Sequence, residues 1–477
     1  MLYRSSSKTP LIICLLMVLL SFANTGCKKE QVLTSGGEVR FSADTLTFDT
    51  VFTAYASFTC SLKIFNPQNE KITLSSIRLE NATSFFHLNI NGIDGNTLKD
   101  VEIAAKDSIY VFATVNIDPQ NQNNPYVISD KLIATLNGKD FSLPFIAYGQ
   151  DAHYIDGEYL QTQTWLTDKP YVIIHSAAVD TDQTLTIPAG CKVYMNGDSR
   201  ILVLGTLKVL GTKTDSVVFQ GDRLDRGYFG NEGYPGEWGG IYFDSYSTQN
   251  EINYAVLKNC GNTALGAQPA AIQLSPDLVT DAVPQLTIRN TIIENSIGYG
   301  ILSFQGSLKA ENCLIHTCGA QALGILQGGQ YEVTNCDFVI FSTDKINHQQ
   351  EPTVALLNYF KNDATNEIFA SNLNATLKNC VIWGGLEDEF FTGKVDDSRF
   401  AYNLTLDHCL IKTKEISSFV SNSGSILNQD PKFVDYINWN FRPQEGSPLT
   451  DAGVPSLAED ITGKPRNGAT DIGCYEY

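Results

Sequence analysis

The stretch Val333-Thr334-Asn335-Cys336 decides the fold of this 477-residue chain, because close variants of it recur along the C-terminal half. Each copy closes a short run of alternating apolar and polar residues. The other copies are Leu257-Lys258-Asn259-Cys260, Ala310-Glu311-Asn312-Cys313 and Leu377-Lys378-Asn379-Cys380, with the degenerate Ile288-Arg289-Asn290-Thr291 and Leu406-Asp407-His408-Cys409. In chain order their last positions are 31, 22, 23, 44 and 29 residues apart, which indicates a unit of about 22 residues. This period suits one coil of a parallel β-solenoid, in which equivalent side chains form ladders.

The repeated pairs are interpreted as a structural ladder and not as a row of ligands. The predicted ladder consists of Asn259, Cys260, Asn312, Cys313, Asn335, Cys336, Asn379 and Cys380. Asparagine tolerates the left-handed backbone of a coil corner, and its amide can bond to the next coil. Cysteines stacked about 4.8 Å apart with parallel Cβ vectors are poorly placed for a disulfide, which needs Cβ atoms about 3.8 Å apart. We therefore expect free, buried thiols at one repeat phase, with Cys60, Cys191, Cys318 and Cys474 scattered outside it.

The composition is that of a globular, acidic protein. Hydrophobic residues make up 43% of the chain and charged residues 18%, and the formal net charge is −19. Nucleic-acid binding needs a basic face, and no cluster of Lys and Arg supplies one. The six histidines show no His-x-His or His-x-x-x-His spacing. No cluster of C-x-x-C or C-x-x-H pairs occurs, since Cys313-Leu314-Ile315-His316 stands alone. We expect no cofactor, although loop carboxylates could hold calcium.

The first 27 residues are typical of an export signal. Arg4 and Lys8 precede an apolar run from Leu11 to Phe22, which is too short to span a membrane. The following Asn24-Thr25-Gly26-Cys27 resembles a bacterial lipobox, which implies that Cys27 is lipidated; the alternative is an ordinary secretory signal. Residues 28–37 are polar and are expected to form a tether. Such a protein would be anchored to outer-membrane lipid through Cys27, at the cell surface or facing the periplasm.

Residues 38–151 predict a β-sandwich. Seven alternating segments, separated by turn residues, run from Leu46 to Ala147. The opening Leu46-Thr47-Phe48-Asp49-Thr50-Val51 and the closing Tyr148-Gly149 resemble Ig-like domains of the ASPM–SPD-2–Hydin type. That resemblance implies a spacer or adhesion module without catalytic residues.

Residues 154–477 predict the β-helix itself. Glycine-punctuated strands such as Ile201 to Thr212, the segment Glu237-Trp238-Gly239-Gly240-Ile241 and the terminal Asp471-Ile472-Gly473-Cys474-Tyr475-Glu476 resemble right-handed parallel β-helix repeat lipoproteins of Bacteroidetes. The 44-residue gap before Cys380 equals two periods, so Val354 to Leu357 is expected to be a strand of an unmarked extra coil. The fold class is therefore all-β, with an Ig-like sandwich followed by a right-handed parallel β-helix.

The loop that precedes Trp238 is the predicted ligand site. It combines aromatic rings, which can stack on sugars, with charged groups for hydroxyl hydrogen bonds. The candidate residues are Asp222, Asp225, Arg226, Tyr228, Phe229 and Tyr234. A plain variable loop, with Trp238 packed beneath it, is the alternative.

No residues are assigned a catalytic role. The acidic stretches Asp180-Thr181-Asp182, Asp396-Asp397 and Asp407-His408 are more simply solvated turns. The predicted function is noncatalytic binding of a polysaccharide or an envelope protein through β-helix loops. A polysaccharide lyase or glycoside hydrolase, and a structural surface or adhesin component, remain the alternatives.

Overall fold

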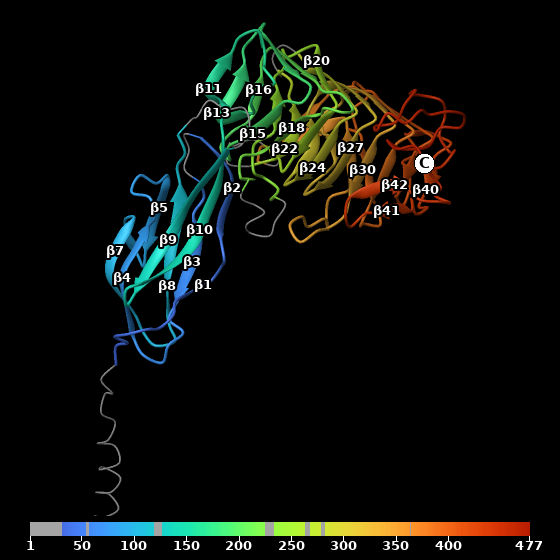
Figure 1. The fold of residues 1–477 in the computed structure, drawn as a ribbon. Coiled ribbons are helices and arrows are strands. Elements are labelled where there is room, and N and C mark those ends of the chain that lie inside the picture. Colours follow the sequence, from blue (N-terminus) through green and yellow to red (C-terminus); the bar gives the residue numbers. More distant parts are fainter. Residues whose placement is uncertain are drawn as a thin grey trace, which may run out of the picture. The chain divides into compact units, whose positions relative to one another are not determined.

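The computed structural model describes residues 31–53, 57–118, 126–224, 233–262, 268–277, 282–362 and 364–477 (Figure 1). Their regular secondary structure is β-strand, which confirms the all-β fold class. The chain divides into two compact units, with Val127–Tyr148 closing the first and Gly149–Tyr477 forming most of the second.

The first unit is a sandwich of two five-stranded sheets. One sheet contains, in order, β1 (Arg40–Phe41), β3 (Cys60–Phe65), β8 (Ser108–Val115), β5 (Phe86–Ile90) and β6 (Ile93–Asp94). The other contains β2 (Leu46–Phe52), β10 (Lys139–Gln150), β9 (Tyr126–Leu136), β4 (Ile72–Leu79) and β7 (Thr97–Ile103). Phe86 of the first sheet lies 5.4 Å, between ring centroids, from both Phe48 and Phe145 of the second, so the inner faces of the two sheets share one core.

The second unit is a parallel β-helix with three faces. Most coils contribute one strand to each face, and within a face each strand pairs in parallel with the equivalent strand of the neighbouring coil. Face 1 contains β15 (Lys192–Met195), β18 (Val217–Gly221), β21 (Ala255–Lys258), β24 (Ile292–Ser296), β27 (Leu314–Cys318), β30 (Asp337–Ile340), β35 (Val381–Gly384), β38 (Leu410–Ile411) and β40 (Ile426–Leu427). Face 2 contains β16 (Ile201–Val203), β19 (Ile241–Phe243), β22 (Ala270–Leu274), β25 (Tyr299–Ser303), β28 (Leu323–Ile325), β31 (Val354–Leu357) and β36 (Phe390–Gly393). Face 3 contains β12 (Gln163–Thr164), β14 (Thr184–Pro188), β17 (Thr206–Leu210), β20 (Asn250–Asn253), β23 (Gln285–Arg289), β26 (Gly306–Glu311), β29 (Gly329–Thr334), β34 (Leu373–Lys378), β37 (Tyr402–Asp407) and β39 (Ser421–Ser423).

Two long strands and two hairpins complete this unit. Strands β11 (His153–Leu160) and β13 (Tyr171–Val179) start the stack, and β13 pairs with both β15 and β16. The hairpins are β32 (Tyr359–Lys361) with β33 (Ile368–Ala370), and β41 (Phe433–Asp435) with β42 (Asn440–Pro443).

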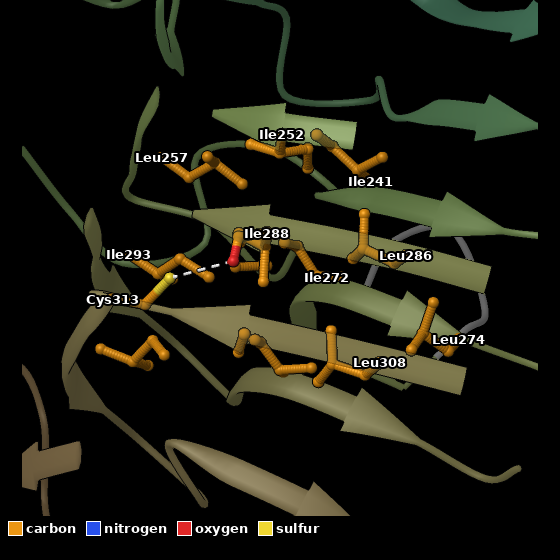
Figure 2. Packing of buried hydrophobic residues seen from close by; sticks show 14 of the residues in the cluster. Ile241, Ile252, Leu257, Ile272, Leu274, Leu286, Ile288, Ile293, Leu308 and Cys313 are labelled. Atoms are coloured by element: carbon orange, nitrogen blue, oxygen red, sulfur yellow. Dashed lines mark hydrogen bonds between the residues drawn. The ribbon is translucent and has the colours of Figure 1, made fainter. Parts of the chain in front are cut away.

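Inward-pointing aliphatic side chains fill the β-helix and form its core (Figure 2). Equivalent residues stack from coil to coil: Leu286 pairs with Leu308, and Ile241 with Ile272. Burying such a side chain completely stabilises the fold by roughly 1.5–3 kcal/mol. The period-2 alternation of the sequence thus supplies one continuous core along the solenoid.

The first corner, between face 3 and face 1, carries most of the predicted ladder. Asn290, Asn312, Asn335 and Asn379 occupy it with φ between 47° and 51°, the left-handed conformation that asparagine tolerates. The cysteines that follow the last three are free and buried, and their thiols donate to backbone carbonyls, as Cys313 Sγ does to Ile288 O at 3.7 Å (Figure 2). The predicted free, buried thiols are therefore confirmed.

The prediction that Asn259-Cys260 shares the repeat phase of the other Asn-Cys pairs is wrong. This pair follows β21 on face 1, and it occupies the second corner, between faces 1 and 2. There Cys260 is equivalent to Ser296, which pairs with Cys318 on the next coil. Cys318 is thus part of a second ladder and is not scattered. The two corners look alike in sequence because both need a left-handed residue followed by a small buried one.

The 44-residue gap is one coil and not two. β29 pairs directly with β34, and β30 pairs directly with β35, so no extra coil lies between them. Val354–Leu357 does form a strand, β31, but it is the face 2 strand of this same coil. The extra length lies in residues 341–353 and in the β32–β33 hairpin.

The C-terminal segment packs along the outside of face 1 and the first corner. Its Phe433, Phe441, Leu449 and Ile472 join a buried cluster with outward-facing residues of face 1. The corner asparagines bind its backbone: Asn335 Nδ2 donates to Gly473 O at 3.0 Å, and Asn379 Nδ2 to Val454 O at 2.7 Å. The predicted ladder therefore also serves as the docking row for the end of the chain.

Candidate functional site

A groove of about 830 Å³ lies over the second corner of the β-helix, and we call it the corner groove. It is lined by residues of three successive coils, by segment 341–345, which directly follows β30 on the next coil, and by segment 436–441, which lies about a hundred residues further along the chain. The lining residues are Gly233, Lys258, Asn259, Glu294, Asn295, Thr317, Phe341, Ser342, Thr343, Asp344, Lys345, Tyr436, Ile437, Asn438, Trp439 and Phe441.

A row of ionisable side chains underlies the corner groove, and two of them line it. Lys258, Glu294 and His316 occupy the same register on β21, β24 and β27, and they point outward from face 1. Lys258 Nζ lies 3.1 Å from Glu294 Oε1, and His316 Nε2 lies 3.6 Å from Glu294 Oε2. Burial alone would raise the pKa of Glu294, but His316 and Lys258 lower it overall. Glu294 is therefore an ionised acceptor held between two nitrogen groups.

Beside this row lies a ladder of polar corner residues. Asn259, Asn295 and Thr317 have φ of 60°, 59° and 54°, and Asn295 Nδ2 donates to Asn259 Oδ1 at 2.6 Å. Asn259 Nδ2 in turn donates to Glu237 Oε2 at 3.3 Å. Gly233 packs so closely on the Asn259 amide that a Cβ there would collide with it. These contacts fix the orientation of the amides that face the groove.

Aromatic side chains form one wall of the corner groove. Trp439 and Phe441 lie over His316, with ring centroids 5.1 and 5.0 Å away. Tyr436 is 46% exposed, and its ring centroid lies 4.3 Å from that of Phe341. The wall thus offers a ring face beside hydrogen-bonding groups, the combination that amphipathic ligands such as sugars use.

Of the six predicted ligand residues, only Asp222 and Tyr234 fall within the described chain; Asp225, Arg226, Tyr228 and Phe229 lie outside the described residues. Tyr234 borders the corner groove, where Lys345 Nζ lies 4.7 Å above its ring centroid and donates to Gly233 O. Asp222 is not among the lining residues: Asn196 Nδ2 donates to it at 2.8 Å, and burial raises its pKa. Trp238 is buried, as the alternative interpretation of this loop expected.

The acidic turns do not line the corner groove. Asp397 pairs with Arg399 at 2.6 Å, and this hydrogen bond lowers its pKa to about 2. Asp407 lies 2.8 Å from Nδ1 of His408, its neighbour at the first corner. Within the described residues, no group of three His, Cys, Asp or Glu side chains is placed to hold a metal ion. In the same part of the chain, no helix has the length and hydrophobicity to cross a bilayer.

The floor of the corner groove was missed by the sequence analysis, although the sequence contains a signal for it. Lys258-Asn259-Cys260, Glu294-Asn295-Ser296 and His316-Thr317-Cys318 share one pattern, a charged or titratable residue followed by a corner residue and a small buried one. Had these three been aligned with one another, the outward row would have been visible. Segments 341–345 and 436–441 carry no such mark.

Comparisons with known proteins add the following. No protein-family model matches the sequence, and the curated proteins compared with it give no match. Among the solved structures that resemble the chain are two catalytic domains of GH87 alpha-1,3-glucanase variants in complex with nigerose. They are 11% and 10% identical to it, with TM-scores of 0.21 and 0.20, and each alignment covers 75% of this chain and 82% of the other. A likeness of this size does not extend what those enzymes bind to this chain, whose β-helix is established by its own strand pairing.

Proposed function

We propose that this protein is a lipid-anchored envelope protein that binds a glycan in the corner groove without cleaving it. The observation that carries the proposal is the pairing of an aromatic wall, Tyr436 and Trp439, with a floor of fixed amides and the ionised Glu294. Sugar rings offer apolar faces for the wall and hydroxyls for the floor. The volume of about 830 Å³ lies within the range of small-molecule sites.

The charge of the corner groove favours an uncharged ligand. Lys258 and Lys345 balance Glu294 and Asp344 among its lining residues, whereas the whole chain carries −19. Anionic polysaccharides would meet repulsion from the surrounding surface without a net positive site to receive them. The anchor at Cys27 would keep the protein at the outer membrane, and another envelope protein is the other partner that we consider.

The test is a glycan array, run with and without calcium, followed by titration of the strongest hit. Tyr436→Ala removes an exposed ring of the wall and should weaken binding about tenfold, or about 1.4 kcal/mol. Phe391→Ala is the matched control, because Phe391 is 51% exposed on β36 and does not line the corner groove. Equal affinities for the two variants, or an array without hits, would count against the proposal.

A hydrolase or lyase is the second candidate, since Lys258, Glu294 and Asp344 line one groove. Glu294 with a lowered pKa could accept a proton but could not act as a general acid. Release of new reducing or unsaturated ends from a polysaccharide, abolished by Glu294→Gln, would establish this candidate. A structural or adhesin role predicts neither binding on the array nor new ends.

A further inference from the structure

We infer that face 3 carries a second binding surface, a shallow trough that takes an uncharged polysaccharide chain lying along the axis of the β-helix. The trough has a volume of about 540 Å³ and is lined by residues of β23, β26, β29, β34 and β37, with two more at the start of β20. None of its lining residues belongs to the corner groove. The inference therefore does not depend on the proposed function.

An uninterrupted row of uncharged polar side chains runs along the trough. Gln285, Ser307, Gln330, Asn374 and Asn403 are register partners on five successive coils. Asn403 Nδ2 donates to Asn374 Oδ1 at 2.8 Å, so the two amides are linked across neighbouring coils. An amide both donates and accepts, so each rung can bond to hydroxyl groups of either orientation.

The charge of the trough selects against ionic polymers. Only one lysine and one glutamate, Lys309 and Glu332, are among its lining residues, although the chain as a whole carries −19. The Lys309 ammonium is already paired with Glu311 at 2.9 Å. An anionic chain would gain no attraction here, and a cationic one would prefer the acidic surface elsewhere.

The geometry favours a polymer over a short sugar. Rungs recur about every 4.8 Å, so the five strands from β23 to β37 extend over about 19 Å, a length that several linked sugar rings would occupy. The one aromatic lining residue, Tyr331, is 2% exposed and points into the core, so it provides no ring for stacking. Each hydrogen bond at such an open surface contributes little, and affinity would come from many rungs acting together on one chain.

The experiment is co-sedimentation of the full-length protein with insoluble or high-molecular-weight glucans, mannan and xylan, with polygalacturonate as the anionic comparison. The triple variant Gln330→Ala, Asn374→Ala, Asn403→Ala should weaken binding to the retained neutral polymer at least tenfold. The double variant Thr184→Ala, Thr186→Ala is the matched control, because these residues also belong to face 3 but lie outside the trough. Thermal unfolding of both variants checks that the fold is intact.

Two further arms separate this surface from the corner groove. Tyr436→Ala should leave polymer binding unchanged, and hexasaccharides of the same polymer should compete at least a hundredfold less well than the polymer on a weight basis. The inference is overturned if the wild-type protein retains no neutral polymer, if the triple variant binds like the control, or if polygalacturonate binds equally well. Loss of polymer binding in Tyr436→Ala alone would assign the polymer to the corner groove and would also overturn it.

Discussion

We expect Asp337 to make the stability of the β-helix depend on pH. It lies on β30 under the C-terminal segment, 2% exposed, in a register row otherwise occupied by Leu314, Val381 and Leu410. Its Oδ1 accepts from Cys474 N at 3.0 Å, and the Cys474 thiol donates to Oδ2 at 3.2 Å. Burial raises the pKa of Asp337 from 3.8 to about 7, against the smaller opposing effects of these bonds and of Arg466.

Because the pKa of Asp337 is raised in the folded state, the β-helix should lose stability as pH rises. Because the folded state holds the proton more tightly than the unfolded chain, the stabilising contribution is complete below pH 3.8 and is lost as pH rises through about 7. The slope inside that window is about 1.4 kcal/mol per pH unit. Between pH 5 and pH 8 the group therefore removes roughly 2–3 kcal/mol from the free energy of unfolding.

The variant Asp337→Asn should remove this dependence, because an amide resembles the protonated carboxyl and does not titrate. The assay is urea unfolding at a series of pH values, with tryptophan fluorescence as the signal that monitors unfolding. All four tryptophans, Trp165, Trp238, Trp383 and Trp439, belong to the β-helix, so the signal reports on that unit. The stability of the variant relative to the wild type should rise by roughly 2–3 kcal/mol from pH 5 to pH 8.

Asp397→Asn provides the control, since the pKa of Asp397, about 2, lies below the tested range and its difference from wild type should stay constant. A constant difference for Asp337→Asn as well would refute the assignment of the buried, protonated carboxyl.

Three more outcomes are expected. Asn335→Ala leaves the Asp471 and Gly473 carbonyls without their donor and should lower the free energy of unfolding by about 1–3 kcal/mol. The control Asn403→Ala, at the exposed face, should change it by less than about 0.5 kcal/mol. Equal effects of the two variants would contradict the role of Asn335 in docking the C-terminal segment. The nine described cysteines are buried, so a thiol reagent should modify them only after denaturation, and rapid reaction of the folded protein would show that the corner thiols are accessible. Cys27→Ala should release the protein from membranes, and a variant that stays membrane-bound would refute the lipid anchor.

The β-helix could be predicted from the sequence because its corners impose local chemistry. A left-handed residue followed by a small buried one leaves a trace at every coil, as Asn312-Cys313 and Asn335-Cys336 do. This sequence pattern does not distinguish the first corner from the second, because both corners require a left-handed residue followed by a small buried one. Insertions within a coil also look like missing coils when only the spacing is counted.

The remaining features depend on contacts that are distant in sequence. β7 of the sandwich lacks the alternation that predicts a strand, because Thr97–Ile103 carries Lys99, Asp100 and Glu102 on an edge strand, where only Val101 and Ile103 are buried. The corner groove exists because Trp439 returns from the C-terminal segment to pack over His316, more than a hundred residues earlier. No local pattern predicts such a return. The sequence therefore predicts a ligand site in the loop before Trp238, and of that loop's described candidates only Tyr234 borders the corner groove.

The docking of the C-terminal segment on the corner asparagines also sets an order for the maturation of the protein. The amides of Asn312, Asn335 and Asn379 bind carbonyls of Glu459, Gly473 and Val454, which are synthesised after the coils that they cover. Until then the corner presents a row of unsatisfied donors and an uncovered apolar face 1. A chain interrupted before this segment would thus expose that apolar surface and be open to proteolysis. The folded protein closes that surface with a segment that follows the coils in the chain.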